Sequence, residues 1–302
     1  MIAVAIVAAH VAALVAWPIL LVGIVNRVKA RWAGRRGPPL LQLGFDRWRL
    51  VRKDVVRSST STAVFAIAPW VVLASALAAS LVVPLAGPAP LGFRFDFLLL
   101  IYLWGLGRLA LMLGALDTGS PFEGMGASRE ATFGALLEPA LVLVLIALAA
   151  ATHGASLAEA LATRPDDPQA APVWIAAIVA LLVVVQVEGA RMPVDDPTTH
   201  LELTMIHEVM VLDHGGPAFG LVLYGASVKL FVLSALFLHV VVPFSATDPA
   251  LDWIAFVAGI LLVAIGIGVV ESVMARLRLV KVPQLLVGAC LLSAFGMLLL
   301  AR

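Results

Sequence analysis

Five ionisable side chains lie inside, or at the ends of, long apolar runs of this 302-residue sequence. They are Arg108, Glu138, Glu188, Lys229 and Glu271. A charge at the centre of a membrane helix costs about 2.5–3.5 kcal/mol on insertion scales, so such groups pair with one another or face a hydrated interior. Each could be a structural ion pair near the end of its run. However, Glu138, Glu188, Lys229 and Glu271 come from four different runs, and burial favours the neutral forms that relay protons. These four side chains are therefore usable in a proton relay.

A second group of polar side chains is concentrated in residues 188–217. This segment holds six of the nineteen acidic residues and three of the six histidines. Pro193 and Pro197 interrupt any continuous helix, because proline lacks a backbone N–H. After them, Thr199 and Glu202 have the spacing of a capping box, which predicts an amphipathic helix running to about Asp213 across the cytoplasmic mouth of a helix bundle.

The histidines of this segment do not have the spacing of a metal site. His207 and Glu208 are followed by His214, which is not the HExxH pattern, and His200 and His207 alone would make a poor closed zinc site. We predict that His207 and Glu208 belong to a polar cluster that carries protons. Cys290 is the only thiol, so this chain alone holds no disulfide, thiolate zinc site or iron–sulfur cluster.

The composition predicts which elements position these residues. The chain is 62% hydrophobic and 13% charged, against about 45–50% and about 25% in soluble proteins. These values exclude a soluble enzyme, a disordered chain and a nucleic-acid binder. Runs of about 20 apolar residues predict membrane helices, and their lack of period-2 alternation excludes a β-barrel. The predicted runs are 2–25, 62–84, 95–115, 131–151, 172–189, 218–243, 251–271 and 283–301.

No linker separates these runs, so we predict one all-α polytopic membrane domain over residues 1–302. Lysine and arginine predict its orientation. Ten of them lie in residues 26–61, and Arg129, Arg191, Arg276, Arg278 and Lys281 fall on the same side. Only Arg94, Arg164 and Arg302 lie on the other side. Because basic loops stay in the cytoplasm, we predict that both termini lie outside the cell membrane.

Residues 26–61 contain a second predicted amphipathic helix. Apolar and charged residues alternate at helical spacing from Pro38 to Asp54, and Pro38-Pro39 would begin the helix. One interpretation is an anchor on the lipid surface. The others are a wall of a lateral opening for a hydrophobic molecule, or a ledge for a soluble partner.

Several motifs resemble a known family. Glu188, Arg191, Pro193, Asp195 and Pro197 have the spacing of the signature loop of respiratory complex I subunit 1, and a glutamate–leucine pair follows at 202–203. Arg129, nine residues before Glu138, and the segment 38–54 also match that family. The run from Pro193 to Met210, and Glu271 followed by Arg276 and Arg278, are similar to the branch of group 4 [NiFe]-hydrogenase membrane subunits, the formate hydrogenlyase subunit 4 family.

This resemblance implies a non-catalytic membrane subunit that docks a peripheral redox arm and links electron transfer to proton or sodium translocation. It implies no cofactor in this chain, with the [NiFe] centre and iron–sulfur clusters in the large and small hydrogenase subunits, and antiporter-like subunits beside it in the membrane. The implied arm-docking residues are Arg191, Pro193, Asp195, Asp196, Pro197, His200 and Glu202. Arg129, Arg276 and Arg278 are implied as structural or coupling arginines.

Two rival functions remain open. A quinone-reducing complex I subunit would use segments 38–54 and 188–217 to line a quinone chamber. A stand-alone secondary transporter would use the buried charges to move its substrate.

Overall fold

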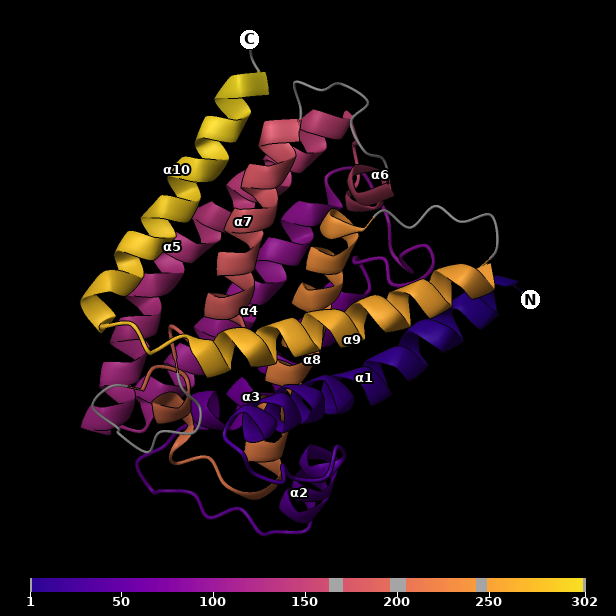
Figure 1. The fold of residues 1–302 in the computed structure, drawn as a ribbon. Helices are drawn as coiled ribbons and strands as arrows, with labels where there is room; N and C mark the ends of the chain where they lie inside the picture. Colours follow the sequence, from indigo (N-terminus) through magenta and orange to yellow (C-terminus); the bar gives the residue numbers. More distant parts are fainter. Residues whose placement is uncertain (1, 163–170, 196–204, 243–248, 301–302) are drawn as a thin grey trace.

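The computed structural model describes residues 2–162, 171–195, 205–242 and 249–300. Within these ranges all regular elements are helices (Figure 1), and eight of them are long and apolar enough to cross a membrane. The predicted all-α polytopic membrane fold is therefore confirmed. The eight spans are α1 (Ile2–Trp32), α3 (Ala63–Ser80), α4 (Asp96–Asp117), α5 (Pro121–Thr152), α7 (Ala171–Glu188), α8 (Gly216–Val241), α9 (Pro249–Val273) and α10 (Val282–Leu300).

Helix α5 begins ten residues before the apolar run that predicts it. Pro121 occupies its first turn, where a missing backbone N–H costs no helical hydrogen bond. The polar stretch at the start of α5 is therefore helical and packs inside the bundle, where Glu123 and Glu130 are buried. This stretch supplies part of the site described below.

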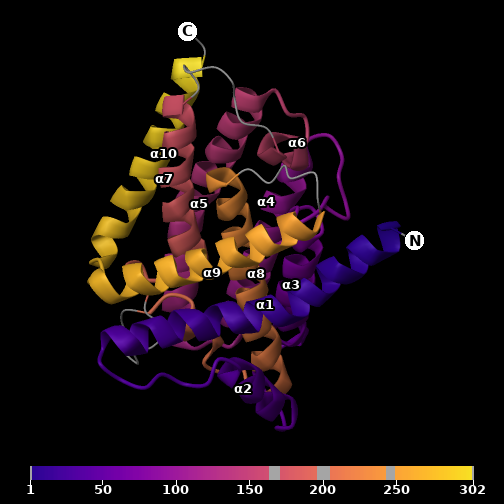
Figure 2. The same cartoon turned by 45° about the vertical axis from the view of Figure 1, so that its right-hand side comes forward.

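The spans pack around α8, which is the most buried of them. Helices α3, α1 and α7 all contact α8, while α5, α7 and α10 pack together at one side. Helices α1 and α9 lie side by side and cross the other spans at a steep tilt (Figures 1 and 2). Gly268 allows this close approach, because a Cβ atom there would lie 2.8 Å from the Cβ of Val28.

Helix α2 (Gln42–Val51) is the amphipathic helix predicted within residues 26–61. It lies beside α8 at the lower end of the molecule in Figure 1. The expected start at Pro38-Pro39 is wrong, since the helix begins three residues after Pro39. Leu41, Phe45, Trp48 and Val51 are exposed on its outer side.

The prediction of a helix running to Asp213 is also wrong for residues 205–213. The only helical element there is the short 3₁₀ helix η2 (Glu208–Val211). Long-range side-chain acceptors take the backbone donors instead. Asp195 accepts the N–H groups of Ile206 and His207 at 3.3 and 3.0 Å. Glu123 accepts the N–H of Asp213 at 3.0 Å. The first part of the predicted helix, within 196–204, lies outside the described residues.

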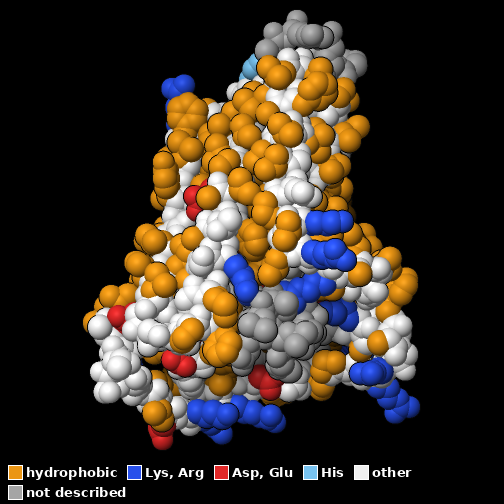
Figure 3. Space-filling model, turned by 90° about the vertical axis from the view of Figure 1, so that its left-hand side faces the viewer, with side chains coloured by type: hydrophobic (Ala, Val, Ile, Leu, Met, Phe, Trp, Pro, Cys, Tyr) orange, Lys and Arg blue, Asp and Glu red, His pale blue; other side chains and the backbone are white. Residues whose placement is uncertain are grey.

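Two short helices complete the described chain: α6 (Leu157–Ala162) and η3 (Leu279–Lys281). Figure 3 shows apolar side chains covering the upper part of one face, and lysine and arginine side chains mostly on its lower part, the end at which α2 lies. This distribution matches the charge asymmetry of the predicted loops.

Candidate functional site

Arg108 on α4 is the centre of a buried ionic cluster. Its guanidinium lies 3.0 Å from Glu130 Oε1, 2.6 Å from Glu138 Oε1 and 2.5 Å from Glu188 Oε2. Glu130 and Glu138 are eight residues apart on α5 and so share a face of that helix, while Glu188 ends α7. Arg108 and Glu188 are both buried. One guanidinium thus holds three carboxylates from two helices.

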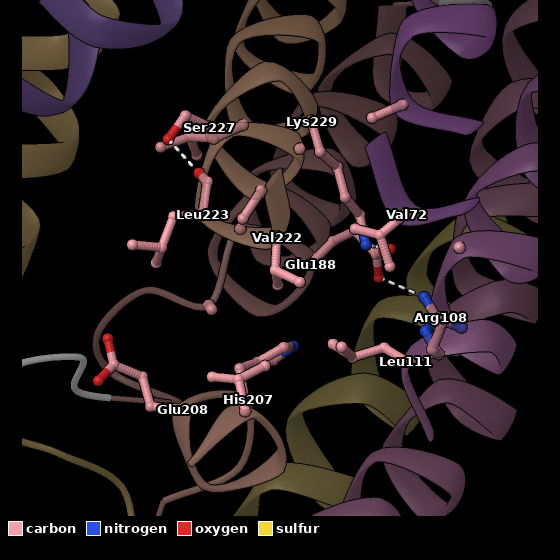
Figure 4. Close-up of a pocket in the computed structure, with 18 of the residues that line it drawn as sticks. Val72, Arg108, Leu111, Glu188, His207, Glu208, Val222, Leu223, Ser227 and Lys229 are labelled. Carbon is pink, nitrogen blue, oxygen red and sulfur yellow. Dashed lines mark hydrogen bonds and ion pairs between the residues drawn. The ribbon is translucent and has the colours of Figure 1, made fainter. Parts of the chain in front are cut away.

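Lys229 on α8 joins this cluster through Glu188. Its ammonium group pairs with Glu188 Oε1, whereas Arg108 donates to the other carboxylate oxygen, Oε2. Figure 4 shows Glu188 between the two cations. A proton can bind Glu188 only in competition with both cations, because each stabilises the carboxylate. Movement of Arg108 or Lys229 would therefore change the proton affinity of the group between them.

His207 connects the cluster to the loop that follows α7. Its Nε2 lies 3.3 Å from Glu130 Oε2 and its Nδ1 lies 3.2 Å from Asp195 Oδ2. Asp195 Oδ1 lies 3.3 Å from Arg276. Burial alone lowers the pKa of His207, but the carboxylates of Glu130 and Asp195 outweigh it and hold that pKa above its usual value. Burial raises the pKa of Asp195, but His207 and Arg276 outweigh it and lower that pKa.

Glu271 on α9 belongs to a separate cluster. Its two carboxylate oxygens contact Lys29 on α1 at 2.8 Å and Arg191 at 3.4 Å. In the described part of the chain, Glu271 forms no ion pair with Arg108 or Lys229, the two cations of the first cluster. The structure thus brings Glu138, Glu188 and Lys229 together and places Glu271 apart from them.

A cavity of about 330 Å³ lies beside the Arg108 cluster. Glu130, Glu188, Lys229 and His207 line one part of it with Arg108. The remaining lining is largely apolar and comes mostly from α1, α2, α3, α4, α8 and η2, but it also includes Arg47, Arg191 and Asp195. Figure 4 shows His207 facing this space, whereas the carboxylate of Glu208 points away from His207. The cavity therefore combines an ionic wall with an apolar one.

The other predicted residues mostly hold the loop in place. Arg129 donates to the carbonyl of Met205 at 2.8 Å, and the carbonyl of Pro193 accepts the N–H of Leu277 at 2.8 Å. Arg278 is exposed at the start of η3. Four predicted docking residues lie outside the described residues: Asp196, Pro197, His200 and Glu202.

Sequence reasoning missed three residues of these clusters. Glu130 lies one residue before the predicted span of 131–151 and so is not among the interior charges, although its spacing of eight from Glu138 places both on one helix face. Arg108 was identified as an interior charge but not assigned to the pathway. Lys29, the partner of Glu271, lies in the helical extension of the first span beyond its apolar run.

Comparisons with known proteins give consistent matches over most of the chain. The sequence profile of the NADH dehydrogenase family matches residues 3–302. Hydrogenase-4 component C of Escherichia coli (strain K12) is 33% identical over 229 residues, which cover 74% of this chain and 71% of that protein. Formate hydrogenlyase subunit 4 of the same strain is 31% identical over 282 residues, 88% of each.

A solved structure has the same fold. It is a chain of the membrane-bound sulfane sulfur reductase, an archaeal respiratory membrane complex, and it matches with a TM-score of 0.80 over 97% of both chains. The identity is 20%, so this match supports the arrangement of helices and not the chemistry.

Proposed function

The chain belongs to the NADH dehydrogenase family of complex I subunit 1-like membrane proteins, and we propose that it is the membrane-anchoring and coupling subunit of an energy-converting [NiFe]-hydrogenase complex. Its relatives in hydrogenase-4 and formate hydrogenlyase support this branch of the family. Redox chemistry then belongs to partners, with the [NiFe] centre in a large subunit and iron–sulfur clusters in a small one. Cys290 alone could not hold either centre.

The observation that carries this proposal is the continuous series of charged contacts from the loop into the membrane span. It runs from Asp195 through His207 and Glu130 to Arg108, and from there to Glu188. A displacement of the loop by the redox arm would separate His207 from Glu130. The Arg108 guanidinium would then shift its contacts among Glu130, Glu138 and Glu188, and the proton affinities of these carboxylates would change. The loop and the ion pathway are thereby coupled by contact.

The exposure of Glu138 on the outside of the bundle supports contact with a further membrane subunit. Its side chain is 46% exposed although it lies near the middle of α5. A carboxylate on the outside of a membrane span needs a polar or protein environment. An antiporter-like subunit against α4 and α5 would cover Glu138 and receive its proton or sodium ion.

We place the basic end, with α2 and the 188–217 segment, in the cytoplasm beneath the arm, and both termini outside the cell membrane. Asp195 is 2% exposed and bonded within the chain. Its part in docking is therefore to hold the shape of the loop, and direct contact with the arm falls to the rest of the segment. A tag at the C-terminus should be accessible only from outside intact cells.

Purification through a tag on this chain tests the proposed complex. We expect co-purifying nickel and hydrogen-dependent dye reduction. Flavin with quinone-sensitive NADH oxidation and no nickel would instead assign the chain to complex I, a rival favoured by the apolar wall of the cavity. Recovery of the chain alone, active in liposome transport, would favour a stand-alone transporter.

A further inference from the structure

Arg47 is a buried cation on the amphipathic helix α2. It is 8% exposed, and its Nη2 donates to the carbonyl of Leu223 at 3.0 Å and to Ser227 Oγ at 2.5 Å on α8. Its guanidinium carbon lies 5.0 Å from the centre of the Tyr224 ring. The remaining nitrogens, Nε and Nη1, are buried and have no hydrogen-bond partner among the residues that the structure describes.

Arg47 also has no counter-charge within the described part of the chain. The other lysine and arginine side chains that line the cavity, Arg108, Arg191 and Lys229, each pair with a glutamate. Among the described residues, no carboxylate forms an ion pair with Arg47. Burial lowers the pKa of Arg47 to about 10, so the guanidinium stays charged at neutral pH. A buried charge without a partner is unfavourable, which points to a counter-charge supplied from outside the chain.

The side chains around Arg47 indicate what kind of molecule could supply the negative counter-charge. Val22 of α1, Leu43 of α2 and Val222 of α8 line the cavity with it. On the outer side of α2, Phe45 and Trp48 are exposed, and the Arg52 guanidinium lies 4.7 Å from the centre of the Trp48 ring. Aromatic and basic side chains in this arrangement are typical of a helix at the membrane–water interface. The molecules that can reach Arg47 from this interface are therefore membrane amphiphiles.

We propose that the α1–α2–α8 end of the cavity binds an anionic phospholipid, with its phosphate at Arg47 and an acyl chain along Val22, Leu43 and Val222. Phosphate oxygens accept charge-assisted hydrogen bonds from a guanidinium, and Nε and Nη1 are the donors that Leu223 and Ser227 leave unused. A neutral carbonyl headgroup would fill the hydrogen bonds but leave the charge unbalanced. This site goes beyond the proposed function and does not depend on which complex the chain joins.

The test measures lipid retained by the full-length protein. The protein is reconstituted with equal amounts of phosphatidylglycerol and phosphatidylcholine, re-extracted in mild detergent, and its bound lipid is counted by native mass spectrometry. We expect the wild type to retain phosphatidylglycerol at least fivefold over phosphatidylcholine. Arg47→Met should abolish this preference, and Arg47→Lys should weaken it because the guanidinium donors are lost while the charge remains.

Two control variants separate charge from packing. Arg49→Met removes an exposed arginine two residues away on the same helix, and Ser227→Ala removes one contact of Arg47 without altering its charge. Both should retain phosphatidylglycerol within twofold of the wild type. Should Arg47→Met fail to fold, the headgroup preference of the wild type and of Arg47→Lys still decides the question.

Three results would overturn the site. The first is equal retention of the two lipids by the wild type. The second is a folded Arg47→Met protein that keeps the wild-type preference. The third is displacement of phosphatidylglycerol by millimolar inorganic phosphate, which would make the site a free-phosphate site instead of a lipid site.

Discussion

At the scale of single residues, Arg108 is the group on which the interior charges depend. It contacts Glu130, Glu138 and Glu188 at once. Arg108→Met would leave these carboxylates without their shared cation, and breaking a buried ion pair costs about 3–5 kcal/mol. We expect a loss of that size in the free energy of unfolding, measured by denaturant titration in detergent. Arg94→Met, at an exposed position, is the control, and equal stability of the two variants would contradict the assignment.

His214 gives a pH-dependent prediction. Its ring stacks on Phe65 with centroids 4.0 Å apart, and within the described ranges neither ring nitrogen has a hydrogen-bond partner. Burial lowers the pKa of His214 from 6.5 to about 4. Between these values the unfolded chain binds more protons than the folded one, so the free energy of unfolding should fall as the pH drops from 6.5 towards 4.

His214→Phe keeps the stacked ring and removes the titration. We expect the variant to show a shallower decline in thermal stability over this pH range. His207 acts with the opposite sign, because its pKa is raised and its contribution is lost as the pH rises through the folded value. A slope that matches the wild type in His214→Phe would show that His214 does not titrate in this way.

Residue type and position predict part of the site. Glu138, Glu188 and Lys229 stand out because charge is rare in apolar runs, and the structure unites them. The grouping of Glu271 with Lys29 and Arg191 was not predictable, because ion-pair partners depend on helix rotation and tilt that a hydropathy pattern does not contain. Arg47 was hidden among basic residues that look alike in sequence.

At the scale of elements, acidic side chains fix the loop before α8. Glu123 on α5 is fully buried and accepts the N–H of Asp213. Glu123→Ala would leave this donor unpaired, which costs about 1–3 kcal/mol. We expect amide exchange in residues 205–214 to accelerate roughly tenfold or more, as measured by hydrogen–deuterium exchange.

Glu159→Ala provides the matched control at the opposite end of the molecule. Glu159 accepts the N–H groups of Ala155 and Ser156, so its removal should accelerate exchange around those residues and leave 205–214 unchanged. If Glu123→Ala leaves the loop as protected as the wild type does, the loop is held by something other than this bond.

The membrane spans were predictable because the length and apolarity of each run are local properties. The segment 205–213 was not, because local pattern favours a helix there while Asp195 and Glu123 take its backbone donors from other parts of the chain. Helix α2 was predicted as an amphipathic element, but its buried side includes a charge. Its exposed apolar side suits a lipid interface better than a protein core.

At the scale of the whole molecule, the charged contacts extend from the loop at the basic end into the bundle beside the cavity. Steeply tilted α1 and α9 bring Lys29 and Glu271 together at the same loop through Arg191. The arrangement connects the loop, the ion cluster and the exposed Glu138 through direct charged contacts. In the proposed complex, this connection would be the physical basis for coupling an arm outside the membrane to ion movement within it.

The most direct test of this coupling is proton uptake by the purified complex in proteoliposomes, with and without sodium, in Glu188→Gln. Glutamine keeps the shape of Glu188 but leaves Arg108 and Lys229 facing a neutral amide. We predict normal assembly and nickel content, with hydrogen-driven ion movement reduced at least tenfold, while Glu159→Gln behaves as the wild type. Ion movement at the wild-type rate in a normally assembled Glu188→Gln complex would contradict the account.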